Sequence, residues 1–263
     1  MSKTKKTPKI SQSLMKGLAD YANKDECGLK FKAKFIDGLS DEPSDAMNLG
    51  NWFEFICTGQ LPRTGEVPEP KRLKSGKLAV DYIRMEVQSD NYTNLMKHHK
   101  FEVIETGYVF NKDADSTGIA DIIARKDGKT CIVDIKSSGL LDDKWNEFGW
   151  NLDALVYKDK LLIQAVHYKY LARKEWGEDA DFYFAVFSTK NKHDALLLKI
   201  NVDEDRMINH EIDIANAKIR VEEGLKNGFK AYPTYRGCTK CFLRESCSEA
   251  LKTPEINEIY YQL

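Results

Sequence analysis

The chain has 263 residues, of which 42% are hydrophobic, 11% aromatic and 31% charged, and its formal net charge is −1. A chain of this length and composition can bury a substantial core, as one large domain or as a domain with appendages. No apolar run approaches the length that spans a bilayer, and no apolar stretch follows the basic start, which argues against membrane and secreted proteins.

The first residues and the cysteines fit a protein of a reducing compartment. Residues 1–10 are basic and polar, and we expect them to form a disordered arm. Because no export signal is found, we expect a cytoplasmic protein whose six cysteines stay reduced. Metal ligation then explains clustered cysteines better than disulfide bonds do.

The hydrophobic pattern predicts a mixture of helices and strands. Spacings of three and four residues predict helices over residues 11–23, 45–57, 77–98, 153–175 and 204–226. A change of period after Lys100 predicts strands over residues 101–110, 118–125, 130–136, 182–188 and 195–202. Asp127-Gly128 is a strong hairpin signal, Ser44 is a candidate N-cap, and the prolines and glycines of residues 59–70 predict a loop.

The order of these elements indicates the fold class. Helices come first, then three strands, a crossover helix and two further strands, which is typical of an α/β or α+β fold with a central mixed sheet flanked by helices. We expect one compact unit: an N-terminal helical segment over residues 11–99, a core over 100–202, and a helix with a cysteine-bearing tail over 203–263.

Two acids and a lysine lie on neighbouring predicted strands. Asp134 and Lys136 point to the same side of their strand, and Asp121 on the partner strand can reach that side. Carboxylates on adjacent strands suit Mg²⁺ or Mn²⁺, and a lysine beside them can stabilise charge on a phosphate or orient water. A surface ion pair is the alternative, but both acids stand in apolar runs, where an unpaired charge is costly.

These residues resemble the PD-(D/E)XK nuclease signature. The following helix carries Gln164 and Tyr168 in the pattern Gln-x-x-x-Tyr, which resembles the RecB-type branch of that superfamily. The resemblance implies a restriction-endonuclease-like core with Asp121, Asp134, Lys136, Gln164 and Tyr168 as catalytic residues. It also implies that the glutamine and the tyrosine support the lysine and contact substrate.

An earlier helix in that branch has a Gly-x-x-x-His pattern whose histidine binds metal. This chain has Gly50 and Glu54 in the corresponding positions, so glutamate replaces histidine. The implied metal ligands are Glu54, Asp121, Asp134 and the main-chain carbonyl of Ile135. A partly exposed helix residue without a metal is the alternative for Glu54.

Three thiols lie within ten residues in Cys238-x-x-Cys241-x₅-Cys247. Thiols so close together in a reducing compartment commonly share a metal. Cys27 is the best candidate for a fourth ligand and Cys57 is the alternative, whereas Cys131 is expected to be a small buried side chain. A zinc ion fits four thiolates on chemistry alone, and a thiol redox role is disfavoured by the third nearby thiol.

One cysteine before the nuclease motif and three after it resemble the iron–sulfur RecB-type nucleases, which include AddB-type helicase–nucleases and CRISPR-associated exonucleases. That resemblance implies a [4Fe–4S] cluster on Cys27, Cys238, Cys241 and Cys247 that ties the N- and C-terminal segments together. It also implies an exonuclease on single-stranded DNA from a prokaryote or phage, with a helicase, recombination or CRISPR-type partner. A catalytically silent module that binds DNA ends or recruits a partner, or a zinc-stabilised variant, is the alternative function.

Two further groups of residues are candidate substrate contacts. Trp145 and Trp150 follow the Asp-Ile-Lys strand and, with Phe148, can stack on unpaired bases, although capping the core is the better explanation for at least two of these three aromatic residues. Lys71 and Arg72 follow the proline-rich loop and can contact the phosphate backbone, although a solvated surface explains them as well.

Overall fold

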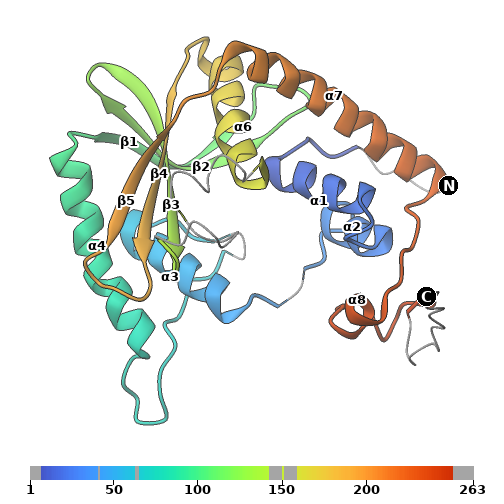
Figure 1. Ribbon diagram of the computed structural model, residues 1–263, viewed down its shortest axis with the longest axis horizontal. Coiled ribbons are helices and arrows are strands. Elements are labelled where there is room, and N and C mark those ends of the chain that lie inside the picture. The colour runs from blue at the N-terminus through green and yellow to red at the C-terminus, as the bar shows by residue number, and fades with distance from the viewer. Residues whose placement is uncertain (1–6, 41, 63–64, 142–149, 151–158, 251–263) are drawn as a thin grey trace, which may run out of the picture. The chain divides into compact units, whose positions relative to one another are not determined.

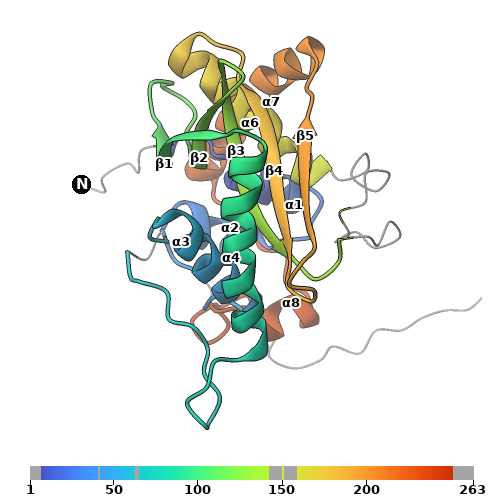
Figure 2. The same ribbon diagram turned by 90° about the vertical axis from the view of Figure 1, so that its left-hand side faces the viewer.

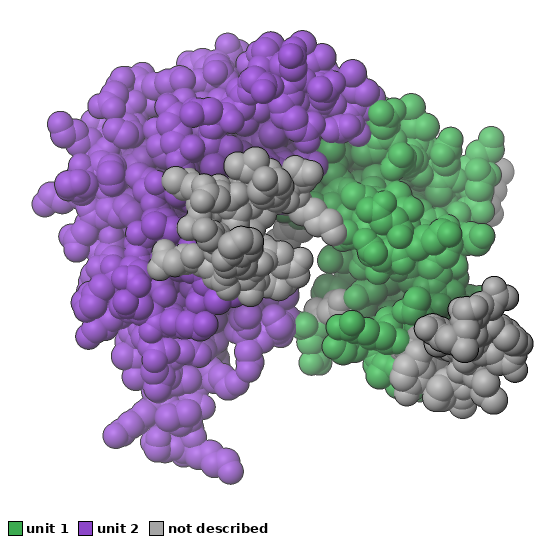
Figure 3. Space-filling model, viewed as in Figure 1, with its two compact units in different colours: residues 1–42, 216–263 green, residues 43–215 purple. Residues whose placement is uncertain are grey.

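The computed structural model describes residues 7–40, 42–62, 65–141, 150 and 159–250 (Figure 1). The chain divides into two compact units, one of residues 43–215 and one of residues 1–42 with 216–263 (Figure 3). Residues 43–99, which precede the sheet, are in the same unit as the sheet, and the expected division at residues 99 and 202 stays a prediction.

The larger unit is built on a five-stranded mixed sheet in the order β1-β2-β3-β4-β5. Its strands are β1 Glu102–Phe110, β2 Gly118–Lys126, β3 Lys129–Ser138, β4 Asp181–Ser188 and β5 Ala195–Ile200. Strands β3 and β4 pair parallel and the other neighbours pair antiparallel. The predicted hairpin is confirmed, since Asp127 and Gly128 have φ angles of 51° and 77°, as a type I′ turn requires.

Helices cover both faces of this sheet (Figures 1 and 2). On one face α3 (Asp45–Thr58) and α4 (Val80–His98) bury Phe53 and Met85 against Val133 and Phe187. On the other face α6 (Asp159–Trp176) contacts β1, β2 and β4. The predicted N-cap is also confirmed, because the Ser44 hydroxyl accepts a hydrogen bond from the Met47 amide at the start of α3.

The smaller unit joins the two ends of the chain. It contains α1 (Gln12–Ala22), α2 (Gly28–Phe35), the last part of α7 (Glu204–Asn227) and the short α8 (Tyr235–Thr239). The Gly28 amide donates to the Lys230 carbonyl at 3.1 Å, and the Lys230 amide donates to the Tyr21 hydroxyl at 2.9 Å. A side chain at Gly28 would overlap the Lys230 carbonyl oxygen, so this junction requires glycine.

Several expectations differ from the observed fold. Ile10 belongs to the arm expected to be disordered, yet its side chain is fully buried and therefore ordered by apolar contacts; residues 1–6 lie outside the described residues. Residues 28–35, which carry no helix prediction, form α2, and α8 interrupts a tail expected to be irregular. Within the described residues, none of the helices is long and apolar enough to cross a membrane.

Two buried histidines link α6 to α7 in the larger unit. His167 Nδ1 lies 3.0 Å from His210 Nε2, and His167 Nε2 lies 3.0 Å from the Thr117 carbonyl oxygen. Because a carbonyl oxygen only accepts, Nε2 of His167 carries the proton and its Nδ1 accepts from His210. Both rings are fully buried, and burial lowers the pKa of His167 to about 4 and that of His210 to about 3.

We expect acid to destabilise the fold through this pair. Between pH 6.5 and about 4 the unfolded chain binds a proton at His167 that the folded chain does not, so the free energy of unfolding falls as the pH falls. From pH 7.5 to pH 5 the decrease through His167 alone is about 2 kcal/mol, which urea unfolding at the two pH values measures. His167→Gln keeps a donor and an acceptor and should reduce this decrease, whereas His193→Gln, at an exposed position, should not. Equal pH dependence in the two variants would contradict the assignment.

Candidate active site

The candidate site lies at a fork in the sheet, where β2 separates from β3. Backbone pairing between these strands ends at Ile122 and Val133, while β2 continues beside β1 and β3 continues beside β4. One residue beyond the last pair come Asp121 on β2 and Asp134 on β3. The two predicted acids are therefore neighbours at the point where the strands part.

Asp121 bridges the fork. Its Oδ2 accepts a hydrogen bond from the backbone amide of Ile135 at 2.8 Å, so a side chain replaces the backbone partner that β2 no longer supplies. Burial, and then the charge of Asp134, raise the pKa of Asp121 well above its ordinary value. The Asp121 carboxylate is thus held beside that of Asp134. Because Asp121 is only partly exposed, little solvent screens the repulsion between the two negative charges.

Asp134 is the buried centre of the site, with an exposed fraction of 1%. Its carboxylate contacts the ammonium of Lys136, which lies two residues further along the same face of β3. It also accepts a hydrogen bond from the side-chain amide of Gln164 on α6. The family resemblance implies that Gln164 supports the lysine; the structure places its amide on Asp134 instead.

Tyr168 lies one helical turn after Gln164 and faces the other branch of the fork. Its hydroxyl donates a hydrogen bond to the Ile119 carbonyl of β2, and its ring stacks on Phe182 with centroids 6.1 Å apart. The side chain is 5% exposed. In this arrangement Tyr168 holds the position of β2 rather than reaching Lys136.

Glu54 approaches the site from α3. This helix passes close to the end of β3, since a Cβ added at Gly50 would lie 3.5 Å from Ser137 Oγ. Burial raises the pKa of Glu54; the positive charge of Lys136 opposes this shift and the negative charge of Asp134 adds to it. Within the described part of the chain, the Glu54 carboxylate forms no hydrogen bond or ion pair.

The lysine remains positively charged in these surroundings. Burial lowers the pKa of Lys136, but the charges of Asp134 and Asp121 outweigh that effect and hold the pKa above its ordinary value. The site therefore sets three carboxylates, those of Glu54, Asp121 and Asp134, against one ammonium. This imbalance favours an additional cation.

The donor set fits a hard divalent cation. Carboxylate oxygens are the ligands that Mg²⁺ and Mn²⁺ prefer, and the Ile135 carbonyl lies on the same strand as Asp134. In the described part of the chain, however, no three His, Cys, Asp or Glu side chains converge closely enough to hold one ion. Lys136 contacts Asp134 in this arrangement.

The candidate substrate contacts are placed unevenly. Trp150 is 6% exposed and packs edge-on against Phe184 with ring centroids 5.4 Å apart, so it caps the core, where an unpaired base does not reach its face. Trp145 lies outside the described residues. Lys71 and Arg72 are both exposed. Lys71 forms an ion pair with Asp45 at 2.6 Å, and Arg72 donates a hydrogen bond to the Gly76 carbonyl, so each already has a partner in this protein.

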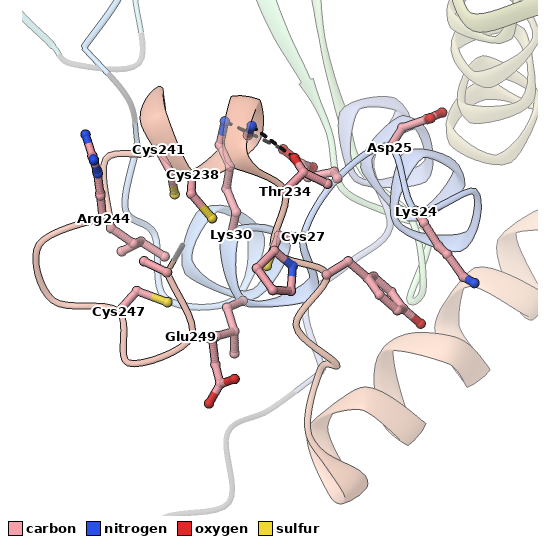
Figure 4. Close-up of a pocket in the computed structure, with 17 residues that line it drawn as sticks. Lys24, Asp25, Cys27, Lys30, Thr234, Cys238, Cys241, Arg244, Cys247 and Glu249 are labelled. Atoms are coloured by element: carbon pink, nitrogen blue, oxygen red, sulfur yellow. Dashed lines mark hydrogen bonds and ion pairs between the residues drawn. The ribbon is translucent and has the colours of Figure 1, made fainter. Parts of the chain in front are cut away.

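The four candidate cluster cysteines line one cavity of about 120 Å³ in the smaller unit (Figure 4). Cys27 is the N-cap of α2, Cys238 lies in α8, and Cys241 and Cys247 lie in the turns that follow. Their thiols face the same space, but they are not gathered tightly enough to ligate a single ion among the residues described. Cys131 is 1% exposed, as expected of a core side chain.

One segment near the site carries no signal in the sequence. The parallel pairing of β3 with β4 puts Ser188 beside Ser138, two residues beyond Lys136. The turn after Ser188 therefore lies at the same end of the sheet as the carboxylates. Because this turn contains no motif, only the strand register identifies it.

Comparison with known proteins gives the family. The crystal structure of a candidate exonuclease from Eubacterium rectale aligns with a TM-score of 0.65 at 19% identity, over 94% of this chain and 91% of that one. LHK-Exo, an alkaline exonuclease from Laribacter hongkongensis solved in complex with dAMP, aligns with a TM-score of 0.48 at 10% identity, over 83% and 90%. No curated protein sequence matches significantly. The sequence profile of the PD-(D/E)XK nuclease superfamily matches residues 60–248, well over half of the chain, and the chain therefore belongs to this superfamily.

Proposed function

We propose that this protein is a Mg²⁺- or Mn²⁺-dependent deoxyribonuclease of the RecB-type branch that degrades single-stranded DNA as an exonuclease. The observation that carries the proposal is the set of three carboxylates around one charged lysine at the fork between β2 and β3. Membership of a nuclease superfamily supports phosphodiester hydrolysis as the reaction. The single-stranded substrate and the attack from an end rest on the resemblance of the motifs to RecB-type exonucleases.

Glu54, Asp121, Asp134 and the Ile135 carbonyl are the proposed metal ligands. A bound Mg²⁺ or Mn²⁺ supplies a Lewis acid for the phosphate and lowers the pKa of its water. Asp121 is held by the Ile135 amide and Asp134 by the Gln164 amide, so both acids are oriented before a cation binds. Burial raises the pKa of Glu54 and of Asp121, and the negative charge of Asp134 adds to both shifts. A bound cation would relieve that like-charge repulsion.

Lys136 is the proposed catalytic cation. Its raised pKa keeps the ammonium protonated at neutral pH, so it can donate hydrogen bonds but cannot accept a proton from water. An ammonium at this position can donate to a non-bridging oxygen of the scissile phosphate, whose negative charge grows as water attacks, or can orient that water. Gln164 and Tyr168 are proposed as positioning residues for the fork.

We expect Lys136→Met to abolish most of the cleavage while the fold persists. Removing a group that stabilises charge only in the transition state lowers the rate by about 10²–10³-fold. Initial rates on end-labelled single-stranded DNA with Mn²⁺ measure this, beside Asp134→Asn, for which we expect a decrease at least as large. Lys129→Met, at an exposed position on the same strand, is the matched control and should keep the wild-type rate.

If Lys136→Met and Asp134→Asn cut as fast as wild type, the proposed active site is wrong. If all four proteins bind DNA without cutting it, the alternative of a catalytically silent end-binding module replaces this proposal. Linear and circular single-stranded substrates separate the modes of attack, because an exonuclease leaves the circle intact.

We expect Gln164→Leu to change metal dependence more than DNA affinity. Removing the amide that orients Asp134 should weaken metal binding by about 10–100-fold, as removal of supporting hydrogen bonds does at other metal sites. Mn²⁺ titrations of the cleavage rate measure the shift, with Gln12→Leu in the smaller unit as a control. A uniform decrease of the rate at every Mn²⁺ concentration would show that Gln164 acts otherwise.

We further propose that Cys27, Cys238, Cys241 and Cys247 bind a [4Fe–4S] cluster in the reducing cytoplasm, with a structural role. The four thiols line one cavity, which supports a shared ligand set. The preference for a cluster over zinc rests on the resemblance to the iron–sulfur nucleases, because four thiolates suit zinc equally well on chemistry alone. A helicase, recombination or CRISPR-type partner remains an expectation from the resemblance alone.

We expect protein purified without oxygen to be brown and to contain iron and sulfide in equal amounts. Cys27→Ser should remove the colour and destabilise the smaller unit, because distant segments are then no longer cross-linked. Cys57→Ser should retain both, which excludes Cys57 as the fourth ligand. Absorbance spectra and metal analysis decide the outcome: colourless protein with one zinc ion would establish the zinc alternative.

A further inference from the structure

The turn that joins β4 to β5, residues 189–194, is held in a defined shape by a buried glutamine on α4. Gln88 has no solvent exposure, and its Nε2 lies within hydrogen-bonding distance of two backbone carbonyls of this turn and of the carbonyl of the last residue of β4. The distances are 3.1 Å to Ser188, 2.9 Å to Asn191 and 2.9 Å to Asp194. A turn between two antiparallel strands can form without a buried side chain that binds its backbone. These contacts therefore fix the turn in one particular shape.

Neighbouring side chains extend the same framework. Asn91, one turn after Gln88 on α4, donates to the Gln88 side-chain oxygen at 2.8 Å and to the Lys192 carbonyl at 2.7 Å. The Ser188 hydroxyl accepts from the amides of Lys190 and Asn191 at 3.2 Å and 2.9 Å. The backbone of the turn is therefore ordered from both sides, although its side chains are exposed.

The strand register places this turn beside the catalytic end of β3. The Thr189 amide donates to the Ser138 carbonyl at 2.8 Å, and a Cβ added at Gly139 would lie 3.2 Å from Lys190 Cε. Three residues separate Gly139 from Lys136, which is about 10 Å along a strand.

The turn presents positive charge toward solvent. Lys190 and Lys192 are exposed, and within the described part of the chain neither ammonium forms an ion pair. His193 and Asp194 are the other titratable groups of the turn, and Arg84 of α4 lies beside it, shared between Asp81 at 2.9 Å and the Thr189 carbonyl at 3.4 Å. Two exposed ammonium groups on an ordered backbone suit a chain of phosphates.

We propose that the turn over residues 189–194 is a second substrate-binding element, in which Lys190 and Lys192 bind phosphates of the nucleic acid near the bond that is cut. Gln88 is the positioning residue that holds the backbone carrying both lysines in place. This inference rests on the proposed nuclease function, because it takes the strand that enters the fork as its ligand.

Binding measurements on a cleavage-deficient protein test the lysines directly. With Asp134→Asn as background, fluorescence anisotropy follows a labelled oligothymidine between about 50 and 200 mM salt. We expect Lys190→Ala/Lys192→Ala to weaken binding by about three- to tenfold per lysine at low salt. The slope of log K against log salt should fall by about 0.7 for each phosphate that a lysine no longer neutralises.

The matched control removes the same charge at the other end of α4. Lys97→Ala/Lys100→Ala changes two exposed lysines and should leave both the affinity and the salt slope close to those of the background protein. If the two double variants behave alike, the turn is not a binding element and the inference is wrong. Cleavage by otherwise wild-type protein is scored separately, so failure of the nuclease proposal is distinguishable from failure of this one.

A double-mutant cycle tests the role of Gln88. If this residue acts by positioning the lysines, Gln88→Leu should weaken oligothymidine binding in the background protein but have little further effect once Lys190 and Lys192 are alanine. Equal effects in the two contexts would show that Gln88 is only structural. Far-UV circular dichroism on each protein verifies that the comparison is made between folded chains.

Discussion

The hydrogen bond from the Ile135 amide to the Asp121 carboxylate is the contact on which the site depends. It forms where β2 and β3 stop pairing, so one side chain both closes the gap in the backbone ladder and carries charge into the site. Asp134 comes next to Asp121 for the same reason, as the residue after the last backbone pair. The fork and the two acids therefore depend on each other. If β2 and β3 stayed paired beyond Ile122 and Val133, no space would open between the strands. If they parted earlier, the two acids would lie further apart.

Much of this arrangement follows from the sequence, because its signals are local. Alternation along residues 130–136 puts Asp134 and Lys136 on one side, and the Asp127-Gly128 turn fixes the hairpin that brings Asp121 beside them. The target of Gln164 was not predictable, since a helix of known length can aim an amide at either the lysine or the acid. In α7 the regular spacing of Ile208, Ile212 and Ile219 predicted a helix correctly, but these side chains are about half exposed. Met207, His210 and Ile214 provide the buried contacts, which depend on packing against other elements.

The smaller unit shows the same limit at longer range. The spacing of Cys238, Cys241 and Cys247 indicates a shared ligand site from sequence alone, whereas the inclusion of Cys27 needs contacts between the ends of the chain. The Gly28–Lys230 and Lys230–Tyr21 hydrogen bonds provide them, and they place Cys27 on the cavity that the other three thiols line. These bonds form between segments about two hundred residues apart, which no local pattern encodes.

Neutral amides help to hold two functional parts of the larger unit in place. Gln164 on α6 orients Asp134 on one face of the sheet, and Gln88 on α4 fixes the turn after β4 on the other. A buried amide costs far less than a buried charge and both donates and accepts hydrogen bonds. A lysine or arginine in place of Gln164 would add a second cation to Asp134, which the Lys136 ammonium already contacts, and would compete with a metal ion for its oxygens. An amide orients a carboxylate without cancelling its negative charge, so that charge stays available to a metal. The same buried amides can therefore stabilise the fold and position the groups that carry out the chemistry.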